Sequence, residues 1–398
     1  MLKYIEYKNK EEFFMNNFTF TYPTKVYFGK GAAENIKAEL AKYGDTVMLA
    51  YGGGSIKKNG VYDEITAMLK EAGKITVEFS GIMPNPTYAK VQEGAEIARQ
   101  NNVSLILAVG GGSVIDCCKI VSAQAKLDED IWAMENEKKK NPTKFIPLGA
   151  VVTVSGTGSE MNAGAVITNE EKKIKGALWG TSADFAVLDP EYTMSVPMKQ
   201  VISGAFDTFS HAMETYFGKP DENNLSDDIN EAVMRSVIRN MRILLTDPKN
   251  YEARSELMWA SAMAENGILK ISKVTDFQAH MIEHQLGAYT DCNHGQGLAV
   301  IHPVLYRHIY KSNTDRFARY AKNVWNATDG ANAEETALKG IEALAIFIKK
   351  IGLPTSFAEM GISGDTNFKA IADSTVVTAG CCKKLSKEEI LEILNECR

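Results

Sequence analysis

The chain has 398 residues, of which 45% are hydrophobic and 24% charged, and its formal net charge is -6 at pH 7. This length predicts two or three domains, and the composition is ordinary for a globular protein. The acidic balance argues against nucleic acid or an anionic membrane surface as a partner, and no apolar run is long enough to span a bilayer.

The cysteines and the first residues bear on the cellular compartment. Six cysteines in a chain of this length, four of them in the adjacent pairs Cys117-Cys118 and Cys381-Cys382, do not form the pattern of a disulfide framework. Residues 1–14 mix lysine and glutamate, and no apolar signal core follows them. We therefore expect a cytoplasmic protein with reduced thiols.

Strands and helices alternate along the first half of the chain. Runs of aliphatic, aromatic and β-branched residues predict strands at 18–22, 25–28, 46–51, 75–79, 103–109, within 145–153 and at 186–189. Helical periodicity predicts helices at 31–43, 62–71, 88–101 and 114–124. This alternation predicts a mostly parallel sheet with helices on both faces.

Two Gly-Gly-Gly-Ser turns each lie between a buried strand and a helix. In that setting, glycines let backbone N–H groups approach an anion at the helix N-terminus. We expect the second turn to bind a pyrophosphate, with Asp116 in the helix behind it, and the first to lie at an adenosine ribose. The alternative is a pair of flexible linkers, and the usual G-x-G-x-x-G fingerprint is absent. The turns consist of Gly52, Gly53, Gly54 and Ser55, and of Gly110, Gly111, Gly112 and Ser113.

A third turn, after the strand within 145–153, is rich in hydroxyl groups. Thr153, Thr157 and Ser159 can hydrogen-bond a phosphate or a ribose, although a plain Ser/Thr-rich loop is the alternative. Leu188, in the strand at 186–189, completes the predicted cofactor-binding residues.

Helical periodicity dominates after residue 197. It covers residues 199–217, 226–246, 251–270 and 333–351. The pattern therefore predicts an α/β dinucleotide-binding domain over residues 1–195 and an all-α metal-binding domain over residues 196–398. The substrate would lie in the cleft between them.

Three of the six histidines fall between residues 280 and 294. His280 and His284 share one face of a helix that Gly287 can end, and His294 follows a polar turn at 290–293. A lone histidine is usually a satisfied core or surface side chain, but this cluster and a second pair favour a divalent metal. The second pair is Asp207 and His211, four residues apart on another helix. The spacing does not select which two of the three later histidines complete the site.

The chain resembles the iron-containing (group III) alcohol dehydrogenase family over residues 15–398, and most of all the butanol dehydrogenases and broad-range aldehyde reductases. The resemblance is carried by motifs at residues 23–29, 51–58, 110–116, 157–160, 207–214 and 280–295. It implies a dehydroquinate-synthase-like fold and commonly a homodimer. The chain departs from the family pattern in its N-terminal extension of about fourteen residues.

The resemblance also implies roles for the site residues. Asp207, His211, His280 and His294 would bind one divalent ion, Fe²⁺ or Zn²⁺, and His284 would lie near the nicotinamide without binding the metal. The implied reaction interconverts short- to medium-chain primary alcohols, such as butanol, and aldehydes by hydride transfer with NAD(P). We expect His284 to relay the proton of the substrate oxygen.

Two other functions remain open from the sequence. A lyase of dehydroquinate-synthase type has to bind a polyanionic sugar acid, but only Lys270, Lys273 and Arg307 lie near the histidine cluster. A non-enzymatic metal-binding protein would leave the glycine turns without a role. We therefore expect the dehydrogenase.

The first glycine turn also predicts the preferred cofactor. NAD-specific sites usually place a carboxylate against the ribose 2′-hydroxyl, and no acid follows the strand at 46–51 until Asp63. Ser55, Lys57 and Lys58 are instead suited to a 2′-phosphate, although both lysines can also be solvated loop residues. We expect NADP(H) to be preferred over NAD(H).

Overall fold

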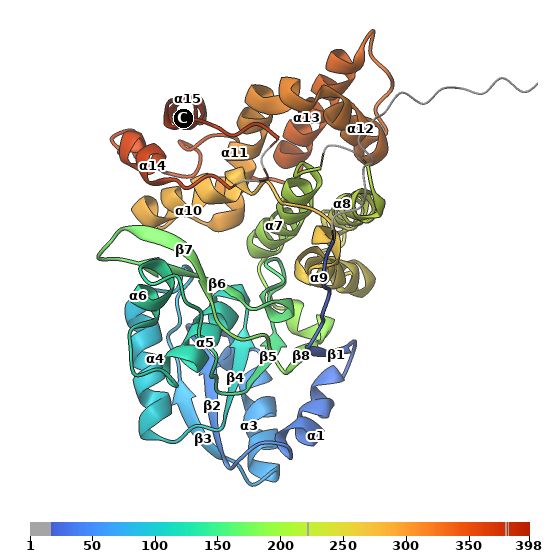
Figure 1. The fold of residues 1–398 in the computed structure, drawn as a ribbon. Helices are drawn as coiled ribbons and strands as arrows, with labels where there is room; N and C mark the ends of the chain where they lie inside the picture. The colour runs from blue at the N-terminus through green and yellow to red at the C-terminus, as the bar shows by residue number, and fades with distance from the viewer. Residues whose placement is uncertain (1–16, 221–222, 379, 381) are drawn as a thin grey trace, which may run out of the picture.

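A computed structural model describes residues 17–220, 223–378, 380 and 382–398. The α/β half forms one end of the molecule and the helical half the other (Figure 1). The hairpin of β6 (Gly164–Asn169) and β7 (Ile174–Trp179) lies against α10 (Gln278–Thr290). The N-terminal extension and Cys381 lie outside the described residues. Cys117, Cys118, Cys292 and Cys397 are free thiols, and in the described part of the chain no helix is both long and apolar enough for a membrane span.

The six-stranded sheet is parallel throughout, as predicted, in the order β1-β8-β5-β4-β2-β3. The chain moves outward from β2 to β3 and then returns to the other side of β2 with β4, so the strand order reverses between β2 and β4. Ligands of open α/β sheets bind at such a point, outside the carboxyl ends of the strands. The strands are β1 (Lys25–Phe28), β2 (Thr46–Tyr51), β3 (Ile75–Phe79), β4 (Leu105–Gly110), β5 (Leu148–Val152) and β8 (Phe185–Leu188).

Helices cover both faces of this sheet, and each face has its own apolar core. The strands β2, β4, β5 and β8 are almost wholly buried because they have neighbours on both faces. One core includes side chains from α4 and α5, and the other includes side chains from α1 and α3. These helices are α1 (Ile36–Leu40), α3 (Val61–Glu71), α4 (Tyr88–Gln100) and α5 (Gly112–Gln124), while the short α2 (Ser55–Lys58) follows the first glycine turn.

Two sequence-based expectations about strands were wrong. Residues 18–22 are not a strand, because no described strand pairs with them, and Phe18 and Phe20 are exposed. The antiparallel hairpin of β6 (Gly164–Asn169) and β7 (Ile174–Trp179) was not expected. Its alternating burial was the available signal, but it packs on α5 and α10 and not in the main sheet.

The second half is helical, as predicted, and α10 carries two of the clustered histidines. This helix continues past Gly287 to Thr290, so the expectation that Gly287 ends it was wrong. A Cβ at Gly287 would lie 3.1 Å from the Lys175 Nζ, so the glycine makes room for a neighbouring side chain. The remaining helices are α6 (Ile131–Asn136), α7 (Met198–Tyr216), α8 (Leu225–Leu244), α9 (Tyr251–Glu265), α10 (Gln278–Thr290), α11 (His294–Ile309), α12 (Thr314–Trp325), α13 (Ala333–Lys350), α14 (Phe368–Ser374) and α15 (Lys387–Glu396).

Glycines let three segments approach each other closely where the two halves meet. A Cβ at Gly204 of α7 would overlap the backbone oxygen of Ser155, which follows β5. A Cβ at Gly295 of α11 would overlap the backbone oxygen of Ser203 on α7. The start of α11 therefore packs on α7, and α7 packs on the loop after β5, which fixes the side chains of all three segments relative to one another.

The packing of the central strands provides a stability test. A Cβ on Gly149 of β5 would overlap the ring of Phe185 on β8. We expect Gly149→Ala to lower the free energy of unfolding by about 1–3 kcal/mol through overpacking. Gly176→Ala on β7 is the control, because its Cβ would meet only Ile174 Cγ2 at 3.8 Å. Urea unfolding followed by circular dichroism measures both, and equal midpoints would contradict the packing argument.

Candidate active site

A groove of about 370 Å³ lies outside the carboxyl ends of β2, β4 and β5. Both glycine turns and the hydroxyl-rich turn line it, together with the first part of α7 and the start of α11. Of the predicted cofactor residues, it contains Gly52, Gly53, Ser55, Gly110, Gly111, Gly112, Ser113, Thr153 and Thr157. The three turns therefore converge at the point where the strand order reverses.

The second glycine turn leads directly into α5, with Gly111 at its N-cap. The N-terminus of this thirteen-residue helix lines the groove, and no side chain caps it. Its first backbone N–H groups are therefore available to a ligand. A Cβ at Gly110 would lie 2.5 Å from Val114, and one at Gly112 would overlap Thr157. These glycines are therefore required by packing as well as by the approach of an anion to the backbone.

Four predicted cofactor residues lie outside this groove. Leu188 is fully buried in an apolar core, and Gly54 does not line the groove. Asp116 and Ser159 line a neighbouring cavity instead, where the Ser159 hydroxyl donates a hydrogen bond to Asp116 Oδ1. The other carboxylate oxygen of Asp116 accepts from the backbone of Val166 at 2.8 Å.

This neighbouring cavity has a volume of about 250 Å³ and lies between the hairpin β6–β7 and the helices α7 and α10. Its wall includes the predicted metal ligands and His284, and also apolar residues. The groove and the cavity share Gly112, Ser113, Thr157, Asp207 and His294. The groove therefore opens into the cavity at the place where the carboxylate and the imidazoles converge.

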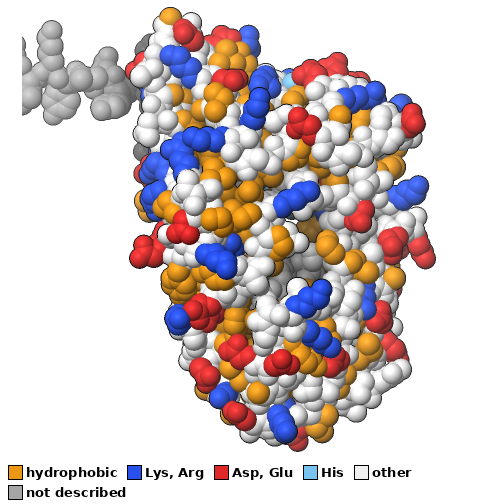
Figure 2. All heavy atoms as spheres, turned by 180° about the vertical axis from the view of Figure 1, so that it is seen from behind, with side chains coloured by type: hydrophobic (Ala, Val, Ile, Leu, Met, Phe, Trp, Pro, Cys, Tyr) orange, Lys and Arg blue, Asp and Glu red, His pale blue; other side chains and the backbone are white. Residues whose placement is uncertain are grey.

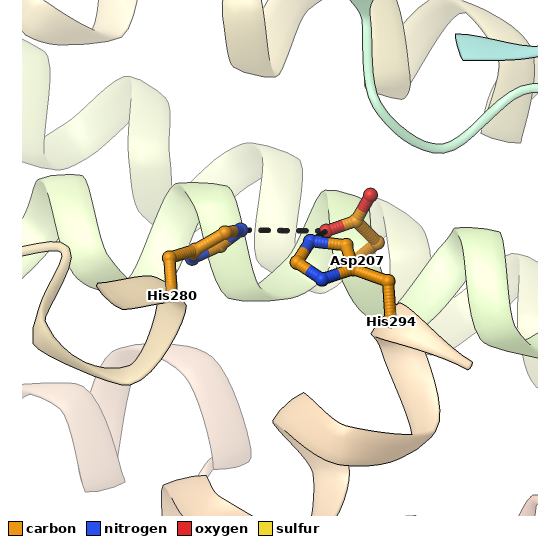
Figure 3. A group of neighbouring side chains, drawn as sticks. All are labelled: Asp207, His280 and His294. Atoms are coloured by element: carbon orange, nitrogen blue, oxygen red, sulfur yellow. Dashed lines mark ion pairs between the residues drawn. The ribbon is translucent and has the colours of Figure 1, made fainter. Parts of the chain in front are cut away.

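Asp207, His280 and His294 come from three helices and point toward one another (Figure 3). Asp207 Oδ1 lies 3.5 Å from His280 Nε2 and 3.4 Å from His294 Nε2. One potential ligand atom from each residue lies within 4.8 Å of those of the other two. The structure thus brings together three of the four predicted ligands.

His211, the fourth predicted ligand, lies beside this group but outside it. Its Nδ1 is 3.8 Å from Asp207 Oδ1, and its ring stacks on that of His280 with 4.5 Å between centroids. His284 belongs to a different group, with Glu283 and His294. The histidines that point Nε2 toward Asp207 are therefore His280 and His294, which matches the pair implied by the resemblance.

Two glutamates that we did not identify as site residues orient these histidines. Glu214 accepts a hydrogen bond from His280 Nδ1, and Glu283 accepts one from His294 Nδ1. Both carboxylates are fully buried. Holding Nδ1 in this way leaves Nε2 as the ligand atom, as in carboxylate–histidine–metal triads. The available signal was spacing: Glu214 lies seven residues after Asp207, and Glu283 three after His280.

The donor atoms of the cluster fit a divalent metal ion. Asp207 Oδ1, His280 Nε2 and His211 Nδ1 are buried and have no hydrogen-bond partner among the described residues. Burial lowers the pKa of His280, but the carboxylates of Glu214 and Asp207 more than offset this effect and raise it to about 10. A field that stabilises an imidazolium at this position also stabilises a metal cation. One carboxylate oxygen with imidazole nitrogens suits Fe²⁺ or Zn²⁺.

His284 lies next to this cluster, with its ring centroid 5.5 Å from that of His294. Burial, together with the nearby ammonium of Lys175, lowers the pKa of His284 well below its usual value. Lys175 reaches the cavity from β7, and its Nζ lies 3.4 Å from Glu283 Oε2. This environment favours the neutral imidazole of His284, whose buried Nδ1 has no hydrogen-bond partner among the described residues. Lys175 could not be predicted as a site residue because the hairpin itself was not predicted.

Comparison with known proteins agrees with this architecture. A family model described as iron-containing alcohol dehydrogenase matches residues 23–190, and one described as the C-terminal part of the Fe-containing alcohol dehydrogenase family matches residues 201–397. NADH-dependent butanol dehydrogenase A of Clostridium acetobutylicum is 40% identical over 392 residues, which cover 96% of this chain and 100% of that protein.

Two further similarities cover most of the chain. The NADPH-dependent aldehyde reductase YqhD of Escherichia coli is 36% identical over 356 residues, which cover 88% of this chain and 91% of that protein. The crystal structure of NADH-dependent butanol dehydrogenase A of Thermotoga maritima aligns with a TM-score of 0.91 at 36% identity, covering 96% of this chain and 99% of that one. These matches confirm the predicted fold class.

The histidine–carboxylate pairs can be tested through metal binding. We expect His294→Ala to abolish stoichiometric metal content because a ligand is lost, and Glu283→Gln to weaken metal affinity about 10- to 100-fold because the orientation of His294 is relaxed. Metal analysis and competition with a chelator measure both effects. His308→Ala is the control, since His308 pairs with Glu396 far from the cavity. Full metal content in His294→Ala would refute the assignment.

Proposed function

The chain belongs to the iron-containing alcohol dehydrogenase family, and we propose that it interconverts short- to medium-chain primary alcohols, such as butanol, and their aldehydes. It is a metal-dependent oxidoreductase that uses a nicotinamide cofactor. The observation that carries the substrate proposal is the junction of the two cavities. A nucleotide groove opens into a small, partly apolar cavity beside the carboxylate–histidine cluster.

We infer that Asp207, His211, His280 and His294 hold the metal ion. When bound, the ion supplies a Lewis acid that polarises the oxygen of the alcohol or aldehyde. Glu214 and Glu283 keep the Nε2 atoms of His280 and His294 directed at it. His211 lies close enough to Asp207 to join the ligand set by turning its ring.

The remaining residues of the site bind the cofactor and handle the proton. We infer that the N-terminus of α5 binds the pyrophosphate and that the shared wall at Gly112, Ser113 and Thr157 places the nicotinamide at the cavity. When bound there, the cofactor would accept a hydride from the substrate C1 at its nicotinamide C4 and return it in the reverse direction. His284, neutral and buried beside the cluster, accepts the proton of the alcohol oxygen and returns it to the aldehyde oxygen in the reverse direction.

The lyase alternative is disfavoured by the charge of the cavity. A polyanionic sugar acid needs several cations around it, but Lys175 is the one lysine or arginine in the lining among the described residues. Lys273 is buried against Asp227, and Arg307 lies 3.9 Å from Glu342. Neither lines the cavity. Apolar side chains such as Val166 and Met281 fit an alkyl chain instead.

We further propose a boundary between domains 1–195 and 196–398, a homodimer and a cytoplasmic location. The last strand ends at Leu188 and α7 begins at Met198, which supports the boundary. Among the described residues, β1 pairs on one side only, and Phe28 and Trp259 are exposed beside it, which supports pairing with a second copy. The free thiols of the buried Cys117 and Cys118 suit a reducing compartment.

The cofactor proposal is a preference for NADP(H) over NAD(H). Gly53 lines the groove, and a Cβ there would meet no heavy atom within 4 Å, so a 2′-phosphate has room. Glu78 lies on the neighbouring strand β3, and its carboxylate does not line the groove. It accepts a hydrogen bond from the Tyr51 hydroxyl at 2.5 Å and lies 3.5 Å from the Lys57 ammonium. Lys57 is thereby held toward Glu78, and Lys58 is exposed at the end of α2. The names of the relatives include both cofactors.

Activity assays test the proposed function. We expect the metal-loaded protein to oxidise primary alcohols between ethanol and octanol with NADP⁺. His284→Ala should keep its metal while kcat falls roughly 100- to 10,000-fold, because a general acid–base contributes by that amount. Metal content and kcat are measured on the same sample. Absence of turnover in the metal-loaded parent would refute the function, and loss of metal from His284→Ala would refute the role of His284.

The cofactor preference is tested at Gly53. We expect the parent to have a higher kcat/KM for NADPH than for NADH with butanal. In Gly53→Asp, the ratio should shift toward NADH roughly tenfold or more, because the new carboxylate repels a 2′-phosphate. Gly53→Asn is the control, since it adds similar bulk without charge. A parent that favours NADH, or an unchanged ratio in Gly53→Asp, would contradict this proposal.

A further inference from the structure

Glu265, the last residue of α9, lies in the wall of the substrate cavity with an unused oxygen atom. Its side chain is 10% exposed, and Oε2 lies 2.8 Å from Lys270 Nζ. Its Oε1 is buried and has no hydrogen-bond partner in the part of the chain that the structure describes. A buried acceptor without a partner costs about 1–3 kcal/mol, so a protein rarely keeps one without a use for it. Apart from Asp207 and the histidines, no other described residue of the lining has such an atom.

The polar groups in hydrogen-bond contact with Glu265 do not use its Oε1. The side-chain amide of Asn162 contacts the backbone oxygens of Glu265 and Gly158, both at 3.4 Å, and Asn162 Oδ1 accepts from Lys119 Nζ at 3.1 Å. The ammonium of Lys270 lies 5.1 Å from the ring centroid of Phe277, in addition to its contact with Glu265. His211 also has an unpaired nitrogen, but its Nδ1 faces Asp207 at 3.8 Å, so Glu265 Oε1 remains open to a donor bound in the cavity.

The net charge around the Glu265 carboxylate decides which kind of chemical group its Oε1 can bind. Lys270 offsets the charge of Glu265, so the pair is close to neutral and does not call for a cation or an anion. An oxygen that accepts a hydrogen bond needs a donor, and a hydroxyl group is the uncharged donor that an alcohol or aldehyde substrate can carry. The carboxylate also lies outside the two groups of residues that could hold a metal ion.

Glu265 acts on the same cavity as the reacting centre. Burial lowers the pKa of His211, and the charges of Asp207 and Glu265 oppose this effect. Apolar residues lie elsewhere in the wall, among them Ala165, Val166, Ala177 and Met281. A short carbon chain can therefore rest on an apolar surface between the metal cluster at one end and the Glu265 carboxylate at the other.

We propose that Glu265 Oε1 binds a second hydroxyl group of the substrate, so that the enzyme favours diols and hydroxyaldehydes over alkanols and alkanals of the same length. The proposal rests on the proposed dehydrogenase function and narrows its substrate class. The hydroxyl at the reacting carbon lies at the metal cluster, and the second hydroxyl donates to Glu265.

Propane-1,3-diol and butan-1-ol form a matched pair of probes, because a hydroxyl in one replaces a methyl in the other. We expect the metal-loaded parent to have a higher kcat/KM for the diol by roughly tenfold or more, the value of one hydrogen bond to a charged group. Calorimetric titration of both alcohols into the metal- and NADPH-loaded protein provides a second readout. No hydride can pass from an alcohol to a reduced cofactor, so this titration measures binding alone.

Three variants assign the preference to Glu265. Glu265→Leu keeps a similar volume and removes the acceptor, so the ratio of diol to butanol should fall roughly tenfold or more in both assays. Glu265→Gln keeps an acceptor oxygen and should retain much of the preference. Glu256→Leu on the same helix is the control: Glu256 is exposed, pairs with Arg239 at 3.4 Å, and should leave the ratio unchanged.

The outcomes separate this proposal from the function on which it rests. A parent that binds the diol no better than butanol, or a Glu265→Leu variant with the parental ratio, overturns the subsite while the dehydrogenase stands. Loss of metal from Glu265→Leu also overturns it, because Glu265 would then belong to the metal cluster. Preferential diol binding without turnover of either alcohol would support the subsite and refute the dehydrogenase function.

Discussion

The burial of one carboxylate among several imidazoles is the constraint on which the rest of this structure depends. Removing charged and polar groups from water is costly unless each of them is paired. Asp207 and the histidines around it pair with one another only in part, because several of their polar atoms have no partner among the described residues. Glu214 and Glu283 accept hydrogen bonds from the outward nitrogens of His280 and His294, and the proposed metal ion would satisfy the inward atoms. The convergence of Asp207 with the histidines is therefore required both for pairing the buried polar groups and for binding a metal ion.

Three helices have to meet at this point, and their backbones approach closely for that reason. Gly204 lets α7 lie against the loop after β5, and Gly295 lets α11 begin against α7. The same loop after β5 forms part of the nucleotide groove. The metal cluster and the groove are thus fixed to each other through backbone contacts, which suits a reaction in which hydride passes directly from substrate to cofactor.

The substrate cavity is built from both halves of the molecule. The hairpin β6–β7 contributes Lys175, whose ammonium lies against Glu283 on α10. Asn85, after β3, donates to Asp291 at 2.8 Å, in the turn that leads to His294. The face of the molecule shown in Figure 2 is hollowed near its middle, and basic and acidic side chains are interspersed on it and do not gather into one patch.

The sequence by itself predicted the strands of the parallel sheet, most of the helices, the glycine turns and a set of candidate metal ligands, because these depend on periodicity and local spacing. It left open which later histidines pair with Asp207, since that depends on how α10 and α11 pack on α7. The hairpin of Lys175, the roles of Glu214 and Glu283, and the unpaired oxygen of Glu265 were decided by the tertiary structure alone. Each depends on contacts between segments far apart in the chain, where burial turns a hydrogen bond or a lone acceptor into a functional group.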